Sequence, residues 1–238
     1  MCEMVVSAWE QPVPFERIRP WGLEVERLGL SGFGWGAAWL DESSGRVDLY
    51  KDTGTLREDL RAQAALEGVE SRRWMVHFRR PSKLSTVDMA DTQPFLVEDA
   101  TWAFSHNGEF RRHNEHREEL RDVLRGRADS EVGFRLFERL LREGLSVDEA
   151  IEETHRRLEG HCNVVYLGAD GRMVVRAGNR HNPVWTFDID GGHWAVTALH
   201  SPDESLFDMI FRDAENRREA EVPSQIVVAE AIREPAHR

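Results

Sequence analysis

Residues 74–79 read WMVHFR and residues 101–106 read TWAFSH, and a polar segment from about residue 80 to residue 94 separates them. Short apolar runs rich in aromatic residues and bounded by polar segments are typical of buried strands. Upstream, residues 33–40 (FGWGAAWL) and 46–51 (RVDLYK) flank a Ser-Ser-Gly turn, which predicts a hairpin. The first half of the chain therefore centres on strands.

Helices are predicted next to these strands. Residues 55–68 place apolar side chains at helical spacing among charges, and residues 114–124 are charged and amphipathic. Residues 130–143 carry Phe134, Phe137, Leu140 and Leu141 on one apolar stripe. The sequence Ser146-Val147-Asp148-Glu149 has the form of a capping box, which predicts a further helix that begins there and ends near residue 159.

The last third of the chain returns to strand patterns. Strands are predicted at residues 162–167, 172–177, 183–188 and 193–198, and another near residue 227. Strands followed by helices and again by strands indicate a layered α+β fold. No internal repeat, low-complexity tract or long linker interrupts residues 1–238, so we expect one domain.

Composition excludes several classes of function. The formal net charge is −12, and lysine occurs only at positions 51 and 83, which argues against a nucleic-acid partner. No run approaches the ~20 apolar residues of a membrane span, and no signal peptide is recognisable. We expect a cytoplasmic protein without a membrane partner.

Nucleotide and metal motifs are absent. The glycines of residues 29–36 do not have the G-x-G-x-x-G spacing, and a predicted strand follows them rather than a helix. His113 and His116 are close at helical spacing, but a solvated helix face explains them without a metal. We therefore predict no metal and no cofactor. Cys162 lies in an apolar strand and is expected to be a buried core thiol.

Cys2 directly follows the initiator methionine. Methionine aminopeptidases remove Met ahead of a small second residue, so Cys2 can become the first residue and carry a free α-amine beside its thiol. An α-amine titrates at ~7.7–8.0 and a thiol at ~8.5, so the amine can take the thiol proton near neutral pH. That pairing is the chemistry of an N-terminal nucleophile. Taken alone, a cysteine at position 2 also fits chance.

Further segments share one order with a known family. They are Gly34-Trp35-Gly36, His77-Phe78-Arg79-Arg80-Pro81-Ser82, Thr92-Gln93-Pro94-Phe95, Phe104-Ser105-His106-Asn107-Gly108 and Ala128-Asp129-Ser130-Glu131. Together with Cys2, this series resembles the class II glutamine amidotransferases, over residues 2–131. The resemblance implies an N-terminal nucleophile hydrolase with a four-layer αββα sandwich.

The resemblance also implies roles for individual residues. Cys2 would be the nucleophile, and the Asn107 side-chain amide and the Gly108 backbone N–H would form the oxyanion hole. Arg79 would bind the substrate α-carboxylate, and Asp129 its α-ammonium. Substrate contacts are also expected from Ser82, Gly34 and Trp35. From the residues alone, Asn107-Gly108 also fits a turn, Asp129 a helix N-cap, Arg79 an exposed arginine and Trp35 a core residue.

Departures from the family pattern limit this inference. Glu3 follows the nucleophile where relatives usually have Arg or Gly, and its carboxylate would raise the pKa of the neighbouring amine and thiol. Arg80-Pro81-Ser82 replaces a more usual aromatic-Ala-Thr run, and Asp91 stands where Asn is common. The head-group site is retained in the pattern, whereas fine specificity is open.

The resemblance extends to short stand-alone members, including the γ-glutamyl amide hydrolases of the ergothioneine pathway. We predict an amidohydrolase that cleaves glutamine or a small γ-glutamyl amide through a thioester on Cys2. One alternative is a glutaminase subunit that delivers ammonia to a separate synthase chain. Another is a catalytically silent γ-glutamyl sensor or scaffold, which the unusual Glu3 next to Cys2 suggests. An unrelated α/β protein with coincidental motifs is a third. The leaving group, the partner and the oligomeric state stay open.

Overall fold

Two antiparallel sheets form the middle of the molecule in the computed structural model, which describes residues 2–199 and 204–232. The larger sheet has seven strands. In spatial order they are β11 (Glu215–Glu219), β9 (Val184–Ile189), β10 (Gly192–Thr197), β1 (Glu3–Pro14), β4 (Glu70–Phe78), β2 (Trp35–Asp41) and β3 (Arg46–Asp52). β1 therefore lies at the centre of this sheet, between β10 and β4.

The smaller sheet has five strands. In spatial order they are β12 (Ser224–Ala229), β8 (Met173–Ala177), β7 (Gly160–Gly168), β6 (Trp102–Phe110) and β5 (Phe95–Leu96). β6 and β7 pair along their full length, from Trp102 opposite Gly168 to Phe110 opposite Gly160. That register brings Asn107 opposite Asn163.

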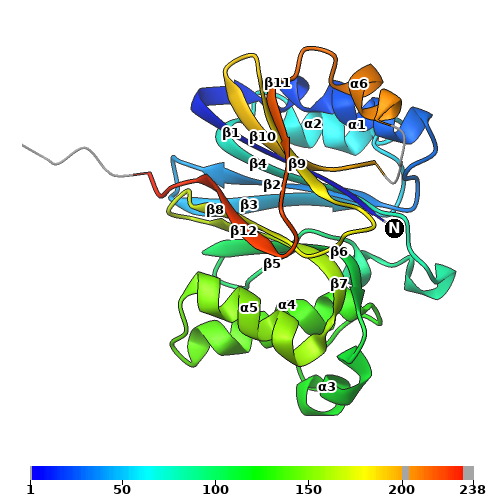
Figure 1. The fold of residues 1–238 in the computed structure, drawn as a ribbon, viewed down its shortest axis with the longest axis vertical. Helices are drawn as coiled ribbons and strands as arrows, with labels where there is room; N and C mark the ends of the chain where they lie inside the picture. Colours follow the sequence, from blue (N-terminus) through cyan, green and yellow to red (C-terminus); the bar gives the residue numbers. More distant parts are fainter. Residues whose placement is uncertain (1, 200–203, 233–238) are drawn as a thin grey trace, which may run out of the picture.

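Helices cover the outer face of each sheet, as Figure 1 shows. The seven-stranded sheet carries α1 (Arg19–Arg27), α2 (Leu60–Leu66) and α6 (Ser205–Ile210), and the five-stranded sheet carries α3 (His113–Leu120), α4 (Asp129–Arg142) and α5 (Val147–Leu158). Short 3-10 turns occupy Phe15–Arg17, Leu84–Thr86 and Met89–Asp91. The predicted four-layer αββα sandwich is confirmed.

Alternating side chains along the strands divide the interior into three apolar clusters. On β4, Trp74, Val76 and Phe78 join the cluster beneath α1, α2 and α6, whereas Met75 joins the cluster between the sheets. On α4, Phe134 and Phe137 face the five-stranded sheet. This alternation follows from the two-residue period of a strand and the near-four-residue period of a helix. Each sheet is therefore covered on both faces.

The predicted elements correspond closely to the observed ones, with a few differences. α2 begins only at Leu60, because the Asp59 side chain caps it by accepting from the Ala62 N–H at 3.0 Å. Ser146 and Glu149 form the predicted capping box of α5. The sequence patterns did not predict β1, β5, α1, α6 or β11. At Asn107-Gly108 no turn occurs, because both residues lie within β6.

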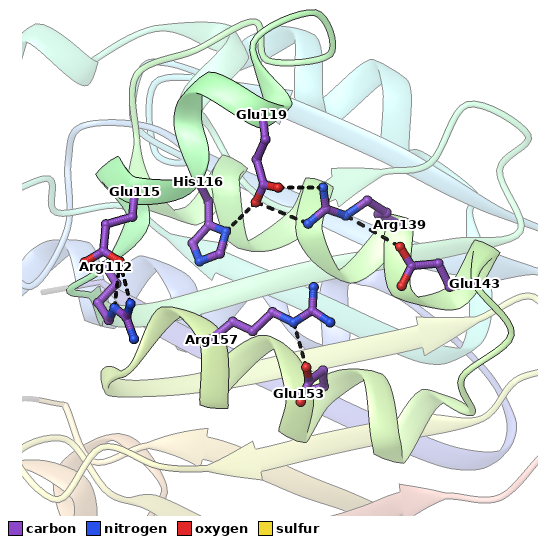
Figure 2. Close-up of polar contacts among 8 residues, drawn as sticks. All are labelled: Arg112, Glu115, His116, Glu119, Arg139, Glu143, Glu153 and Arg157. Atoms are coloured by element: carbon purple, nitrogen blue, oxygen red, sulfur yellow. Dashed lines mark hydrogen bonds and ion pairs between the residues drawn. The ribbon is translucent and has the colours of Figure 1, made fainter.

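Most charges on the outer helices are paired with one another, as Figure 2 shows for α3, α4 and α5. His116 contacts Glu119, which also pairs with Arg139 at 3.1 Å, and Arg139 lies 3.8 Å from Glu143. His116 thus lies on a polar helix face, whereas His113 contacts the Phe110 carbonyl at 2.6 Å. Among the described helices, none is long and apolar enough to cross a membrane.

Candidate active site

One cavity, with a volume of about 450 Å³, collects most of the residues singled out from the sequence. Cys2, Arg79, Ser82, Gly108 and Asp129 all line it. They come from the start of β1, the segment after β4, β6, and the start of α4. Figure 1 shows the start of β1 at one end of the sandwich, level with the space between the two sheets. Antiparallel pairing therefore brings together positions up to 127 residues apart.

Cys2 immediately precedes β1, whose first residue Glu3 lies opposite Phe78 of β4. The Cys2 sulfur accepts a hydrogen bond from the Arg80 backbone N–H at 3.4 Å. Burial raises the pKa of the Cys2 thiol, while the Arg80 N–H and the nearby Arg79 charge oppose that rise. Stabilising the thiolate therefore depends on the few donors and cations that reach it.

Arg79 is the first residue after β4, and its side chain is almost entirely buried, with 3% exposed. Its backbone N–H donates to the Gly34 carbonyl at 2.8 Å, which fixes where the side chain starts. Arg80, by contrast, is exposed. A buried guanidinium on a cavity wall is costly unless an anion balances it, so Arg79 is not an ordinary surface arginine.

Asp129 is the first residue of α4, and the N-cap position belongs to Ala128. The Asp129 carboxylate instead accepts from the Phe110 backbone N–H of β6 at 2.8 Å. The preceding segment is held by buried Asp91, whose Oδ1 accepts from the Arg127 N–H at 2.8 Å and the Ala128 N–H at 2.7 Å. Asp91, which the sequence marked only as a departure from the family pattern, thus positions the start of α4.

Gly108 has a positive φ of 130°, and a Cβ there would lie 2.1 Å from the His161 carbonyl oxygen and 2.7 Å from the Cys162 Cα. Because the obstructing atoms are backbone, only glycine fits at this position. The closeness of β7 therefore explains why a glycine follows Asn107 inside a strand.

The Asn107 side chain is completely buried beneath Cys2, and its Nδ2 donates to the Cys2 carbonyl oxygen. Its Oδ1 accepts from Asn163 Nδ2 at 3.2 Å and from Asn182 Nδ2 at 3.4 Å. An amide nitrogen carries two N–H groups, so one remains for a second acceptor. The sequence analysis identified Asn107 but neither of these two partners.

Backbone donors fix the orientation of this amide through Asn163. Asn163 Oδ1 accepts from the Gly178 N–H at 3.0 Å and the Asn179 N–H at 3.1 Å, so that end must be the oxygen. Its Nδ2 then faces Asn107 and can only donate, which turns Asn107 Oδ1 toward Asn163. Asn107 Nδ2 consequently points to Cys2. The one signal in the sequence was a polar residue inside the apolar run 162–167.

Glu3 is completely buried. Its carboxylate accepts from Thr197 Oγ1 and from Asn182 Nδ2, the latter at 3.4 Å. Its negative charge adds to the rise in the Cys2 pKa, but burial of the thiol is the larger cause. The expected effect of Glu3 on the thiol therefore has the predicted sign and a secondary weight.

Gly34 and Trp35 are not among the residues that line the cavity. Trp35 is fully buried in the cluster beneath the helices, where its ring lies 5.9 Å from that of Phe15 and its Nε1 donates to Asp59 at 3.2 Å. Gly34 contributes through its carbonyl contact with Arg79. Ser82 lines the cavity and is exposed.

Other sequence features lie near the cavity or in the core. Gln93 bonds both backbone groups of His106, accepting from its N–H at 2.6 Å and donating to its carbonyl at 3.1 Å. Cys162 is completely buried, which raises the pKa of its thiol to about 12. Within residues 2–199 and 204–232, no group of three or more His, Cys, Asp or Glu side chains could hold a metal ion.

A curated protein matches part of this chain. Over 151 residues the chain is 28% identical to glutamine–fructose-6-phosphate aminotransferase (isomerizing) of Halalkalibacterium halodurans, a match that covers 61% of this chain and 24% of that protein. The chain spans about a quarter of this curated relative.

Solved structures show the same fold. The glutamine phosphoribosylpyrophosphate amidotransferase of B. subtilis matches 98% of this chain and 50% of its own, with a TM-score of 0.70 and 17% identity. A glutamine aminotransferase class-II domain protein from Silicibacter pomeroyi matches 96% of this chain and all of its own, with a TM-score of 0.61 and 18% identity.

A family model supplies the assignment. The model for class II glutamine amidotransferases matches residues 24–187, more than half of the chain and a span that includes Arg79, Asn107, Gly108 and Asp129. The predicted resemblance is confirmed: this chain belongs to the class II glutamine amidotransferase family.

Proposed function

We propose that this chain hydrolyses the γ-amide of glutamine or of a small γ-glutamyl amide through a thioester on Cys2. The observation that carries the proposal is the shared cavity, which Cys2, Arg79, Gly108 and Asp129 all line. Those residues supply a nucleophile, a cation, a backbone donor and an anion. A free amino acid with a side-chain amide needs each of these partners.

The nucleophile forms when Met1 is removed. The Cys2 α-amine then takes the thiol proton, directly or through a water, and the sulfur attacks the γ-carbonyl carbon. The carbon–nitrogen bond breaks as the amine departs with a proton returned by the α-ammonium. Water, activated by the same amine, next attacks the thioester, so that the carbon–sulfur bond breaks and glutamate is released.

The negative charge on the carbonyl oxygen needs donors that are already oriented. Asn107 Nδ2 points toward Cys2, and Gly108 follows it along β6. Preoriented donors cost no reorganisation during the reaction, which makes them more effective than water. The asparagine amide held through Asn163 fits this requirement.

The head group of the substrate is a zwitterion. The buried Arg79 guanidinium suits its α-carboxylate, with which it can form two parallel hydrogen bonds. Asp129 suits the α-ammonium, and Ser82 offers a hydroxyl at the cavity edge. Binding both charges at once selects a free γ-glutamyl group over an internal peptide residue.

Intact-mass spectrometry with a glutamine-like diazoketone tests the proposal. We expect a protein that lacks Met1 and gains one adduct, no adduct on Cys2→Ala, and an undiminished adduct on Cys162→Ala. Cys162 is the matched control because it is the other cysteine and is fully buried. Retained Met1 in active material, or an adduct that survives Cys2→Ala, overturns the proposal.

Ammonia release then separates the alternative roles. Release by the isolated chain supports the hydrolase, whereas release only with a separate synthase chain identifies a glutaminase subunit. The relatives support the second role, because this chain matches only 24% of the aminotransferase and 50% of the amidotransferase that it resembles. Binding of glutamate without an adduct identifies a sensor.

A further inference from the structure

Two groups of segments line the cavity, and they reach different atoms of Cys2. The first group comprises residues 79–86 and 127–130 and includes both head-group residues, Arg79 and Asp129. Its Arg80 N–H contacts the Cys2 sulfur. The second group comprises the neighbouring ends of β6 and β7 and the loop 178–183, whose Asn182 Nδ2 lies 3.4 Å from the Cys2 carbonyl oxygen.

A γ-glutamyl group bound by Arg79 and Asp129 occupies the first group with its head. Its carbonyl carbon meets the sulfur, so the amine side of the amide extends toward the second group. The cavity of about 450 Å³ lies within the ~300–1,000 Å³ range of sites that hold drug-sized ligands. The volume therefore accommodates a leaving group larger than ammonia.

Two exposed imidazoles lie in the second group. His161, at the start of β7, and His181, in the loop 178–183, both line the cavity, and their rings meet edge to face with centroids 5.6 Å apart. Within the described ranges, the ring nitrogens of His161 and of His181 form no hydrogen bond. Their donors are therefore available to a ligand.

The loop that carries His181 is held in place. The Gly178 and Asn179 N–H groups donate to Asn163, and the His181 N–H donates to Asn179 Oδ1 at 3.1 Å. An anchored loop loses little conformational freedom when a ligand binds, so it presents a preorganised site.

The charge of the lining indicates what this site binds. The cations are Arg79, Arg80, Lys83 and Arg127, and the anions are Glu109 and Asp129. Arg79 and Asp129 balance the head group. Arg80, Lys83 and Arg127, which belong to the first group, then outnumber Glu109, which lies in the second group beside the imidazoles. This excess is positive on a chain of net charge −12. Oppositely charged ligands are drawn to such a cavity.

We infer that the His161–His181 pair binds a carboxylate on the leaving amine, so that the preferred substrates are γ-glutamyl amino acids. This inference rests on the proposed hydrolase function. Hydrolysis of such a substrate releases glutamate and a free amino acid, whose carboxylate is the group held by the two imidazoles.

Matched substrates test the inference. γ-Glutamylglycine and γ-glutamylmethylamide differ only in the leaving-group carboxylate, and glutamine gives the reference rate. We expect kcat/KM for γ-glutamylglycine to exceed that for the methylamide about tenfold or more, as for one hydrogen bond to a charged group. High salt should reduce this ratio, because exposed charges are screened.

Variants sharpen the test. His161→Leu and His181→Leu remove the ring donors and should lower the ratio, whereas His116→Leu, the same change at a histidine that does not line the cavity, should leave it at the wild-type value. Glu109→Gln should raise the ratio by removing the one remaining anion. Equal rates for the two amides, or an unchanged ratio in both histidine variants, overturn the inference while glutamine turnover keeps the proposed function. If no substrate is hydrolysed, the proposed function itself fails.

Discussion

The buried amides around Cys2 and the ion pairs of the outer helices are both polar networks, but they differ in exposure. Asn107 and Asn163 are completely buried, whereas the side chains of Glu119 and Arg139 are 43% and 32% exposed. Water can replace a lost partner of these exposed pairs on α3 and α4, which Figure 2 shows. Asn107 has no exposed surface, so a lost partner there leaves a buried polar atom unsatisfied.

This difference in exposure predicts different effects of substitution in the two networks. In the buried network each hydrogen bond determines which way the next amide points, and the chain of bonds ends at Cys2. On the helices the ion pairs share partners, but they are exposed to water and each contributes little to stability. We therefore expect substitutions in the buried network to change turnover and those on the helices to change almost nothing.

The largest expected effect comes from Asn107→Ala. Loss of one oxyanion donor should lower kcat by ~10²–10³ with a small change in KM, because the charged oxygen exists only along the reaction path. Steady-state kinetics measure both constants. Asn114→Ala, an exposed asparagine on α3, is the control. An effect confined to KM would contradict the assigned role of Asn107.

Asn163→Asp should have the next largest effect. Aspartate keeps the shape and still accepts from Gly178 and Asn179, but it cannot donate to Asn107 Oδ1. The Asn107 amide then turns over and presents oxygen to the developing charge, so kcat should fall about tenfold or more, the value of a charged hydrogen bond.

A double-mutant cycle distinguishes this positioning from general damage. In the Asn107→Ala background, Asn163→Asp should lower kcat little further, because the amide that it orients is gone. Circular dichroism melts show whether each variant is folded. Additive losses in the cycle would place the effect of Asn163 elsewhere.

The pH dependence of Cys2 gives a smaller, graded effect. Burial raises the thiol pKa, so the thiolate fraction is low at neutral pH and grows as pH rises through the raised value. Alkylation by iodoacetamide in a Cys162→Ala background should follow that rise. Arg79→Met should move the profile to higher pH, because the Arg79 charge favours the thiolate, and Arg79→Lys should largely restore it.

Arg46→Met is the control for lost charge. Arg46 lies opposite Asp41 in the β2–β3 register, at the end of β2 far from Trp35. The substitution therefore removes a cation from the same sheet away from Cys2. A profile that shifts equally in Arg46→Met and Arg79→Met would show that overall charge, rather than the Arg79 contact, sets the thiol reactivity.

The smallest effect is expected on the helices. Glu119→Gln removes the contacts with His116 and Arg139 and should change the free energy of unfolding by about 0.2–1 kcal/mol, as for other exposed pairs. Urea denaturation measures that change, and amide hydrolysis should stay at the wild-type rate. A loss of turnover would mean that the two networks are coupled.

Local patterns predicted most of the elements and much of the cavity lining. Some features depend only on neighbouring residues and can therefore be predicted from one sequence. They are the cap at Ser146, the apolar stripe of α4 and the strands around residues 74 and 101. Central β1 was missed, although its apolar residues lie in both adjoining clusters. Trp35 illustrates the limit, because strand register alone decides which face of β2 it occupies.

Sequence by itself determined the chemical groups: a cysteine at position 2, an Asn-Gly pair, an arginine and an aspartate in family order, and the alternation that builds the two sheets. Tertiary structure alone decided which amide faces which. Asn163 and Asn182 lie 56 and 75 residues from Asn107, and only the pairing of β6 with β7 and the path of the loop 178–183 bring them into contact. Hydrogen bonds act over about 3 Å, so their partners are set by packing rather than by spacing along the chain.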